Sequence, residues 1–205
     1  MWINEGFTTF IENKISSQIH GEDFGLVEAF IGNQSLWVDI VDFGLNNTYG
    51  SLYPVLDGDN PDNSYSSVPY DKGFQLLYYL ESLIGGENFR DFLRFWIQTN
   101  SLTSVTNIQL RASWEYFVST RLTSLTGDEI NKILKKVDWE TWIYKPTLAP
   151  VELDFTTERS NQAQSLALQY IALNGTGSPP EYEAYLSYYS NLKIVFQDTL
   201  AANID

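Results

Sequence analysis

The sequence predicts an all-α, mainly helical protein, and three observations support this. Apolar residues recur at helical spacing in several segments, capping-box pairs precede two of these segments, and glycine and proline cluster between them. Of the 205 residues, 43% are hydrophobic and 15% aromatic, which is enough apolar material for a packed core. We therefore expect one folded domain, or one domain with part of a second.

The first helix is expected from about Trp2 to Ile19, ending near Gly21. Its apolar residues should form one broad face: Ile3, Phe7, Phe10, Ile11 and Ile15. Glu5 and Glu12 lie two turns apart on the opposite polar stripe. Two such carboxylates can hold a metal or face water, and spacing alone favours water.

Residues 22–44 fit a strand in part, but the absence of a hairpin partner favours a helix. Residues 46–67 are rich in Gly, Pro, Asn, Asp and Ser, so they should form a loop with several turns. Four acids in and after this loop hint at a cation: Asp57, Asp59, Asp62 and Asp71. Their spacing departs from the EF-hand register, and no Glu closes the run, so calcium is the weaker interpretation.

The next segment, 70–84, is apolar around most of its circumference and should be a central helix that ends at Gly85 and Gly86. An amphipathic helix is expected at 87–99. Thr106 with Gln109 and Thr126 with Glu129 read as capping boxes that open two more helices. A short helical turn at 139–144 carries two tryptophans that look like packing anchors.

Composition changes after this turn. Two prolines and no periodicity predict an extended linker at 144–156. A helix is expected at 157–172, a break at 174–180 and a second, Tyr-rich helix at 181–200. These two helices are too few to bury their own apolar faces. We therefore expect a helical domain at 1–143, the linker at 144–156, and the start of a truncated helical domain at 157–205.

Composition also excludes several classes of function. The formal net charge of −14 argues against nucleic acid and anionic membrane surfaces as partners, and no apolar run approaches a membrane span. The chain has no cysteine, which excludes disulfides, thiolate metal sites and a cysteine nucleophile, and fits a cytoplasmic location. The single histidine, His20, cannot complete a catalytic triad or a two-histidine metal site, and we expect it at a helix end.

Tyr65 and Tyr70 lie where the long loop meets the central helix. A phenol held there stays protonated near neutral pH and can donate a hydrogen bond to an oxyanion on a substrate carbonyl. The alternative is that both pack as half-buried aromatic side chains among the 13 tyrosines. The residues alone leave both interpretations open.

Three segments together resemble one enzyme family. They are W-I-N-E-G-F-T-T-F-I-E at 2–12, D-N-S-Y-S-S-V-P-Y-D-K-G at 62–73 and V-D-W-E-T-W-I-Y-K-P-T-L-A-P at 137–150. Their order and spacing are similar to those of the zinc aminopeptidases of family M1, and most closely the leukotriene A4 hydrolase branch. The resemblance covers residues 1–150 well, whereas the last fifty residues match only as generic helices.

The resemblance implies roles for individual residues. Glu5 matches the third ligand of a single zinc ion whose other two ligands are the histidines of an H-E-x-x-H helix. Tyr70 matches the tyrosine that stabilises the tetrahedral intermediate. Tyr65 matches a second pocket tyrosine of the hydrolase branch, and Asp62 an acid that helps direct water during epoxide opening. Apart from the resemblance, we hypothesise that Glu12, on the same face of the helix as Glu5, orients a metal ligand without binding the metal itself.

The resemblance implies that 1–143 is the helical, C-terminal lobe of a thermolysin-like (gluzincin) catalytic domain, followed by the beginning of an α-helical superhelical domain. H-E-x-x-H, the strand that binds a peptide amino terminus and the basic residues that bind a substrate carboxylate are all missing from this sequence. We expect a fragment that is inactive without its upstream catalytic lobe and downstream helical domain.

The implied substrates are peptides cleaved at their amino termini, with a lipid epoxide as the other class. The alternative is a non-catalytic helical interaction module derived from the same scaffold. The joint presence of Glu5, Asp62, Tyr65 and Tyr70 favours the enzyme.

Overall fold

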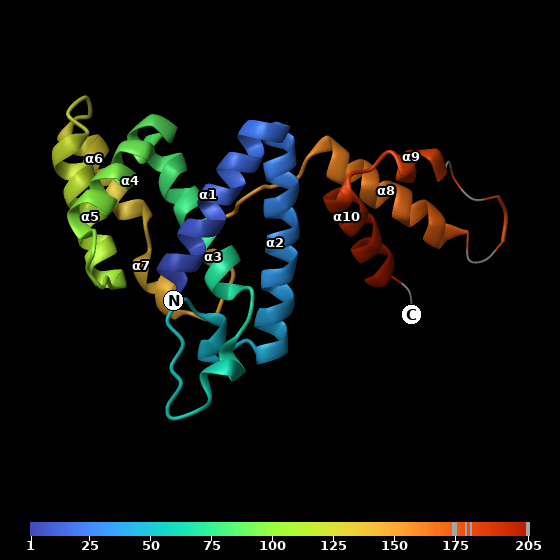
Figure 1. Cartoon of the computed structure of the whole chain (residues 1–205), viewed down its shortest axis with the longest axis horizontal. Helices are drawn as coiled ribbons and strands as arrows, with labels where there is room; N and C mark the ends of the chain where they lie inside the picture. The colour runs from blue at the N-terminus through green and yellow to red at the C-terminus, as the bar shows by residue number, and fades with distance from the viewer. Residues whose placement is uncertain (174–175, 179, 181, 204–205) are drawn as a thin grey trace. The chain divides into compact units, whose positions relative to one another are not determined.

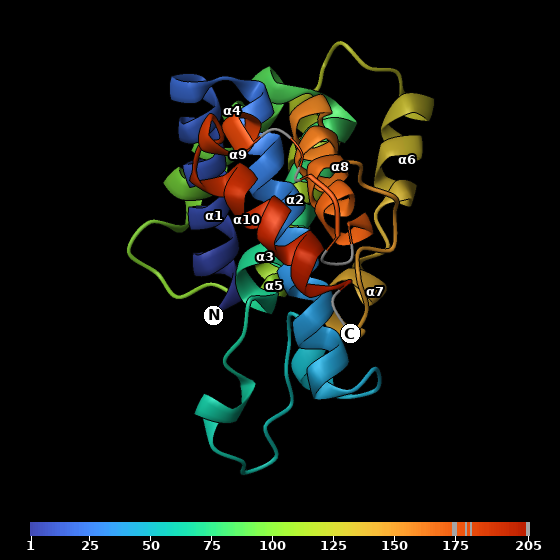
Figure 2. The ribbon, with the colours of Figure 1, turned by 90° about the vertical axis from the view of Figure 1, so that its right-hand side faces the viewer.

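The computed structural model describes residues 1–173, 176–178, 180 and 182–203. Over these residues every regular element is a helix, which confirms the predicted all-α class (Figure 1). The α-helices are α1 (Trp2–His20), α2 (Glu22–Phe43), α3 (Val68–Ile84), α4 (Gly86–Asn100), α5 (Asn107–Arg121), α6 (Gly127–Lys136), α7 (Trp139–Tyr144), α8 (Glu158–Ala172), α9 (Tyr182–Leu186) and α10 (Ser190–Ala201). Two short 3-10 helices, η1 (Thr48–Gly50) and η2 (Pro61–Ser64), interrupt the loop between α2 and α3, which Figure 2 shows as a long arm.

The chain forms two compact units. Unit 1 comprises residues 1–10 and 36–153, and unit 2 comprises residues 11–35 and 154–205. The long helices α1 and α2 therefore each contribute one half to each unit. The boundary at 153–154 falls inside the segment that the sequence predicts as a linker.

Unit 1 is built around α3 and an aromatic cluster. Leu76, Leu77 and Leu80 of α3 are fully buried, as expected for the most apolar helix of the chain. The rings of Phe92 and Trp114 meet edge to face with centroids 5.3 Å apart, which joins α4 to α5. The predicted capping boxes at the starts of α5 and α6 are both present.

Unit 2 has its own apolar core. Seven buried residues form it: Val27, Ala163, Leu166, Ala167, Leu192, Val195 and Phe196. Tyrosines pack around this cluster, including Tyr185, whose ring centroid lies 4.9 Å from that of Phe196. Because residues 11–35 belong to this unit, α8 and α10 do not have to bury their apolar faces against each other alone.

Two sequence-based predictions are wrong in detail. Ile11 and Ile15 were expected on the buried face of the first helix, but both are exposed. Trp2, Gly6 and Phe10 are the buried positions of α1, because a glycine there lets a neighbouring helix approach closely.

The second error concerns 181–200, which was expected to be one helix. Over its described part the chain is interrupted between α9 and α10, where Tyr189 takes an extended conformation as the N-cap of α10. Tyr185, Tyr188 and Tyr189 all pack against the core of unit 2, and this packing outweighs the local helical pattern. The predicted break at 174–180 falls partly on residues outside the described set, as does Glu181.

No helix in the described part of the chain is long and apolar enough to cross a membrane.

Candidate functional site

The start of α1 and the first half of α3 cross at two glycines of unit 1 (Figure 1). A Cβ placed on Gly6 would lie 2.7 Å from the Cα of Gly73, and one on Gly73 would lie 2.8 Å from the Cα of Gly6. Distances this short mean that the two backbones are in direct contact, and any side chain would force the helices apart. The crossing therefore fixes the residues beside these glycines, Glu5 on α1 and the first turn of α3, within reach of one another.

The segment before α3 satisfies the backbone donors at the start of that helix. The N–H of Val68 donates to the Ser66 hydroxyl at 3.3 Å, and Pro69, in the first turn, has no N–H to satisfy. The carbonyl oxygen of Ser67 accepts from the N–H groups of Tyr70 and Asp71, at 3.0 and 2.8 Å. The run Y-S-S-V-P-Y thus gives Tyr70 a well-defined backbone position.

The Tyr70 phenol lies close to Glu5 and Tyr65, the two side chains that perturb its pKa. The pKa of the Tyr70 phenol is raised above its ordinary value, first because the group is partly desolvated and then by the negative charge of Glu5. A raised pKa keeps this phenol protonated throughout the neutral range, so it remains a hydrogen-bond donor. Glu5 and Tyr70, which the sequence analysis assigned to different motifs, therefore lie close enough for the charge of one to affect the other.

The other predicted site residues lie further out. Tyr65 contacts Tyr70, but 71% of its surface is exposed. Asp62 is exposed in η2, and no hydrogen bond between described residues engages its carboxylate. Glu12 is an exposed residue of unit 2, where its charge raises the pKa of Glu28, a smaller effect than the burial of Glu28. The structure thus brings together Glu5, Tyr65 and Tyr70, and not Asp62 or Glu12.

One carboxylate of this group fits a metal, but the described residues do not complete a metal site. No group of three or more His, Cys, Asp or Glu side chains in the described part of the chain could hold an ion. Catalytic zinc sites in hydrolases have three protein ligands, and this group offers a single candidate carboxylate, that of Glu5. The single histidine, His20, is the last residue of α1, as expected for a helix-end residue, and its ring packs against Phe24 in unit 2.

Three buried or half-buried charged residues lie near Tyr70, and two of them, Asp39 and Lys72, were not selected from the sequence. Asp39 of α2 accepts a hydrogen bond from the N–H of Ser67 at 2.6 Å. The pKa of Asp71 is raised to about 6, mainly by burial and further by the charge of Asp39. Burial lowers the pKa of Lys72 to about 7, and its Nζ donates to the carbonyl oxygens of Lys145 at 2.6 Å and Gly50 at 3.4 Å. The signal that could have found Lys72 is its position, directly after Asp71, within an otherwise apolar helix.

One acid of the long loop, Asp59, forms hydrogen bonds within the loop itself. Asp59 accepts hydrogen bonds from the Tyr49 hydroxyl at 2.6 Å and from the Asn63 amide at 2.9 Å. These bonds, with that of the Tyr49 hydroxyl first, lower the pKa of the Asp59 carboxyl. Asp59 therefore links η1 to η2 through these two hydrogen bonds.

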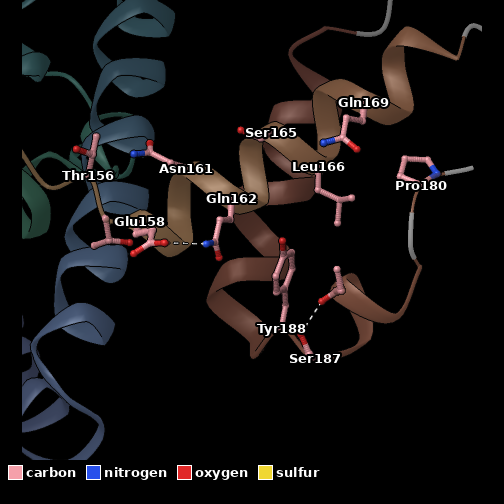
Figure 3. A pocket seen from close by; sticks show the side chains of 12 residues that line it. Thr156, Glu158, Asn161, Gln162, Ser165, Leu166, Gln169, Pro180, Ser187 and Tyr188 are labelled. Atoms are coloured by element: carbon pink, nitrogen blue, oxygen red, sulfur yellow. Dashed lines mark hydrogen bonds between the residues drawn. The ribbon is translucent and has the colours of Figure 1, made fainter.

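Unit 2 contains a separate groove of about 1060 Å³ between α8 and the α9 region (Figure 3). Its lining is mostly neutral and polar, with Asn161, Gln162, Ser165 and Gln169 along α8. Glu158 at its edge accepts a hydrogen bond from Gln162 at 3.1 Å. The groove holds none of the predicted site residues.

The model of the peptidase family M1 domain matches residues 1–142. The chain is 33% identical over 196 residues to leucine aminopeptidase 2 of Aspergillus clavatus, which covers 95% of this chain and 31% of that protein. It is also 32% identical to a leukotriene A-4 hydrolase homolog of Botryotinia fuckeliana, and this match covers 95% of this chain and 29% of that protein.

Among solved structures, native LTA4 hydrolase of Saccharomyces cerevisiae is similar, with a TM-score of 0.83 and 29% identity over all of this chain and 32% of that one. A complex of yeast LTA4 hydrolase with bestatin has a TM-score of 0.81 and is 30% identical in sequence, again over all of this chain and 32% of that one. The chain spans about a third of the length of these relatives and corresponds to a helical portion of their scaffold.

Proposed function

This chain belongs to peptidase family M1, and from that premise we propose that it is part of a zinc-dependent aminopeptidase of the leukotriene A4 hydrolase type. The proposed reaction is hydrolysis of the amino-terminal peptide bond of a peptide, in the cytoplasm. The observation that carries the proposal is the placement of Tyr70 beside Glu5, whose negative charge raises the pKa of the phenol, because it sets an oxyanion donor next to a carboxylate that suits a metal.

Each residue of this group has a proposed task. Glu5 would contribute one carboxylate ligand, and the remaining two ligands would come from histidines that this sequence does not contain. In such a site the metal supplies Lewis acidity and a bound water with a lowered pKa. The protonated phenol of Tyr70 would donate to the oxygen of the carbonyl under attack, where negative charge develops. The Gly6–Gly73 contact supports this by holding both residues in fixed positions.

A chimera tests the proposal directly. In the Aspergillus clavatus relative, the matched segment is replaced by this chain, and hydrolysis of leucine p-nitroanilide and bound zinc are both measured. We expect an active chimera with one zinc per chain. Glu5→Gln should lose most of the zinc and the activity, because a neutral amide is a poor ligand for zinc.

Glu115→Gln on α5 is the matched control, since this carboxylate pairs with Arg111 on the surface of the same unit. It should retain both zinc and activity. A chimera that binds zinc and hydrolyses the substrate equally well with Glu5→Gln would contradict the proposed role of Glu5.

By itself, the 205-residue chain is expected to hold no stoichiometric zinc and to show no peptidase activity, because a single carboxylate binds zinc weakly. Metal analysis of the purified chain checks this. One zinc per chain would overturn the assignment of the missing ligands to another segment.

A lipid epoxide is the second candidate substrate, and one observation favours it. Tyr65 lies between Tyr70 and the open surface, and the exposed Asp62 lies three residues before it in the chain. A carboxylate free of protein partners is suited to orienting a water molecule. In the chimera, Asp62→Asn should then reduce epoxide hydrolysis and leave peptide hydrolysis intact. Equal loss of both activities would contradict this second assignment.

A further inference from the structure

Three helices in this chain close their own N-termini in the same way. In α5, α6 and α8 the third helical residue accepts a hydrogen bond from the backbone N–H of the N-cap residue. The pairs are Thr106 to Gln109 at 2.8 Å, Thr126 to Glu129 at 2.8 Å and Thr157 to Ser160 at 2.9 Å. This reciprocal arrangement satisfies a donor that would otherwise be unpaired.

Helix α3 cannot use this arrangement. Its N-cap is Ser67 and its third residue is Tyr70, whose phenol extends away to Glu5 and Tyr65. The acceptor for the Ser67 N–H is instead the carboxylate of Asp39, which lies 28 residues earlier, on α2, at a distance of 2.6 Å. A distance this short is typical of a hydrogen bond strengthened by a full charge.

We propose that Asp39 is a positioning residue for Tyr70. Its carboxylate accepts the N-cap hydrogen bond that Tyr70, the third residue of α3, cannot accept. The inference rests on the proposed function, in which Tyr70 must be held as an oxyanion donor. It assigns to the α2 carboxylate a role in fixing the orientation of that phenol.

The path from Asp39 to Tyr70 is short and consists of hydrogen bonds. The Asp39 carboxylate accepts a hydrogen bond from the N–H of Ser67. The carbonyl oxygen of Ser67 in turn accepts one from the N–H of Tyr70 at 3.0 Å. Ser67 is thus held from both sides, and its own side chain forms no capping bond. Without the carboxylate, the first turn of α3 would lose the hydrogen bond that ties Ser67 to α2, and the Tyr70 ring would gain freedom to move.

The test uses the full 205-residue chain and two nuclear magnetic resonance signals that do not depend on activity. These are hydrogen exchange at the Ser67 amide and the ¹³Cζ shift of Tyr70, which is assigned with Tyr70→Phe. In Asp39→Ala, Ser67 exchange should rise roughly five- to thirtyfold, the range expected for a lost cap. The Tyr70 signal should move toward that of free tyrosine, while the Leu76 and Leu77 amides stay protected.

Asp42→Ala is the matched control, since it removes an exposed carboxylate from the same helix with the same change in net charge. It should leave both signals unchanged. Asp39→Asn keeps an acceptor oxygen and should restore most of the Tyr70 signal, with Ser67 exchange raised roughly threefold.

Identical Ser67 exchange and Tyr70 shifts in Asp39→Ala and Asp42→Ala would overturn the inference. If Asp39→Ala does not fold, the comparison of Asp39→Asn with Asp42→Asn decides, and equal Ser67 exchange in the two again overturns it. An inactive chimera would contradict the proposed function without affecting these signals, so the two failures are distinguishable.

Discussion

Tyr70 in unit 1 and Tyr189 in unit 2 are both half-buried phenols whose pKa is raised chiefly by burial. Tyr70 lies beside the carboxylate of Glu5, which further raises its pKa, whereas the Tyr189 hydroxyl is buried and has no hydrogen-bond partner among the described residues. The Tyr189 ring stacks on Phe24, with Arg159 on its face at 5.5 Å. A raised pKa alone therefore does not identify a catalytic phenol, and the neighbouring groups must be compared.

The largest expected difference is in catalysis. In the chimera, Tyr70→Phe should lower kcat about 10²- to 10³-fold with zinc retained, because one oxyanion donor is lost. Tyr189→Phe should change kcat by less than about twofold, since its hydroxyl faces no substrate in the proposed site. Equal losses in the two variants would show that the contrast between the tyrosines has no catalytic meaning.

Stability should respond next most strongly, at the helix crossing that supports Tyr70. Gly73→Ala should lower the free energy of unfolding by about 2–3 kcal/mol, because the new Cβ would meet the backbone of Gly6 at 2.8 Å. Gly127→Ala is the control, since nothing lies within 4 Å of a Cβ at that helical position. Urea denaturation of both variants checks the prediction, and equal midpoints would contradict the close contact.

The pH dependence of stability sharpens the contrast around Tyr70. The folded-state pKa of Asp71 is about 6, above its ordinary value of 3.8, so the folded chain binds a proton that the unfolded chain has released. Stability from this group is full below pH 3.8 and is lost as the pH rises through 6. Lys72 acts in the opposite direction, with its contribution lost as the pH falls from 10.5 through about 7.

Asp71→Asn should therefore remove the fall in stability between pH 4 and 6. At pH 7 it should raise the free energy of unfolding by about 1–2 kcal/mol. Asp42→Asn serves as the exposed control on α2. Urea titrations at several pH values test this, and an unchanged pH profile in Asp71→Asn would count against a buried, ionised carboxylate beside Asp39.

The smallest effect is expected at the phenol of unit 2. Tyr189→Phe removes a buried hydroxyl with no described partner, so it should leave the unfolding free energy unchanged or raise it by less than about 1 kcal/mol. Thermal denaturation of the variant measures this. A loss of more than about 1 kcal/mol would mean that the hydroxyl does have a partner, and the comparison with Tyr70 would weaken.

The helices and their caps were predictable because their signals are local. Periodicity indicated α3, and the spacing of Thr106 and Gln109 indicated the start of α5. The broken helix at Tyr189 was not predictable, because its cause is packing against a core drawn from distant segments.

The candidate site follows the same division. Glu5 and Tyr70 were found through short motifs, but their roles remain predictions. The contact between Gly6 and Gly73 was missed because a hydrophobic pattern gives glycine no weight. Asp39 was missed because its partner, Ser67, lies 28 residues away and on another element. Long-range backbone contacts of this kind leave no periodic signal.

The central claim is that Glu5 and Tyr70 interact directly across the α1–α3 crossing. The most direct test is a ¹³Cζ titration of Tyr70 in the 205-residue chain with and without Glu5→Gln. Because the Glu5 charge raises the pKa of Tyr70, the variant should titrate at lower pH than the wild type, though still above a free tyrosine because burial remains. Identical titration curves for the two proteins would contradict the claim.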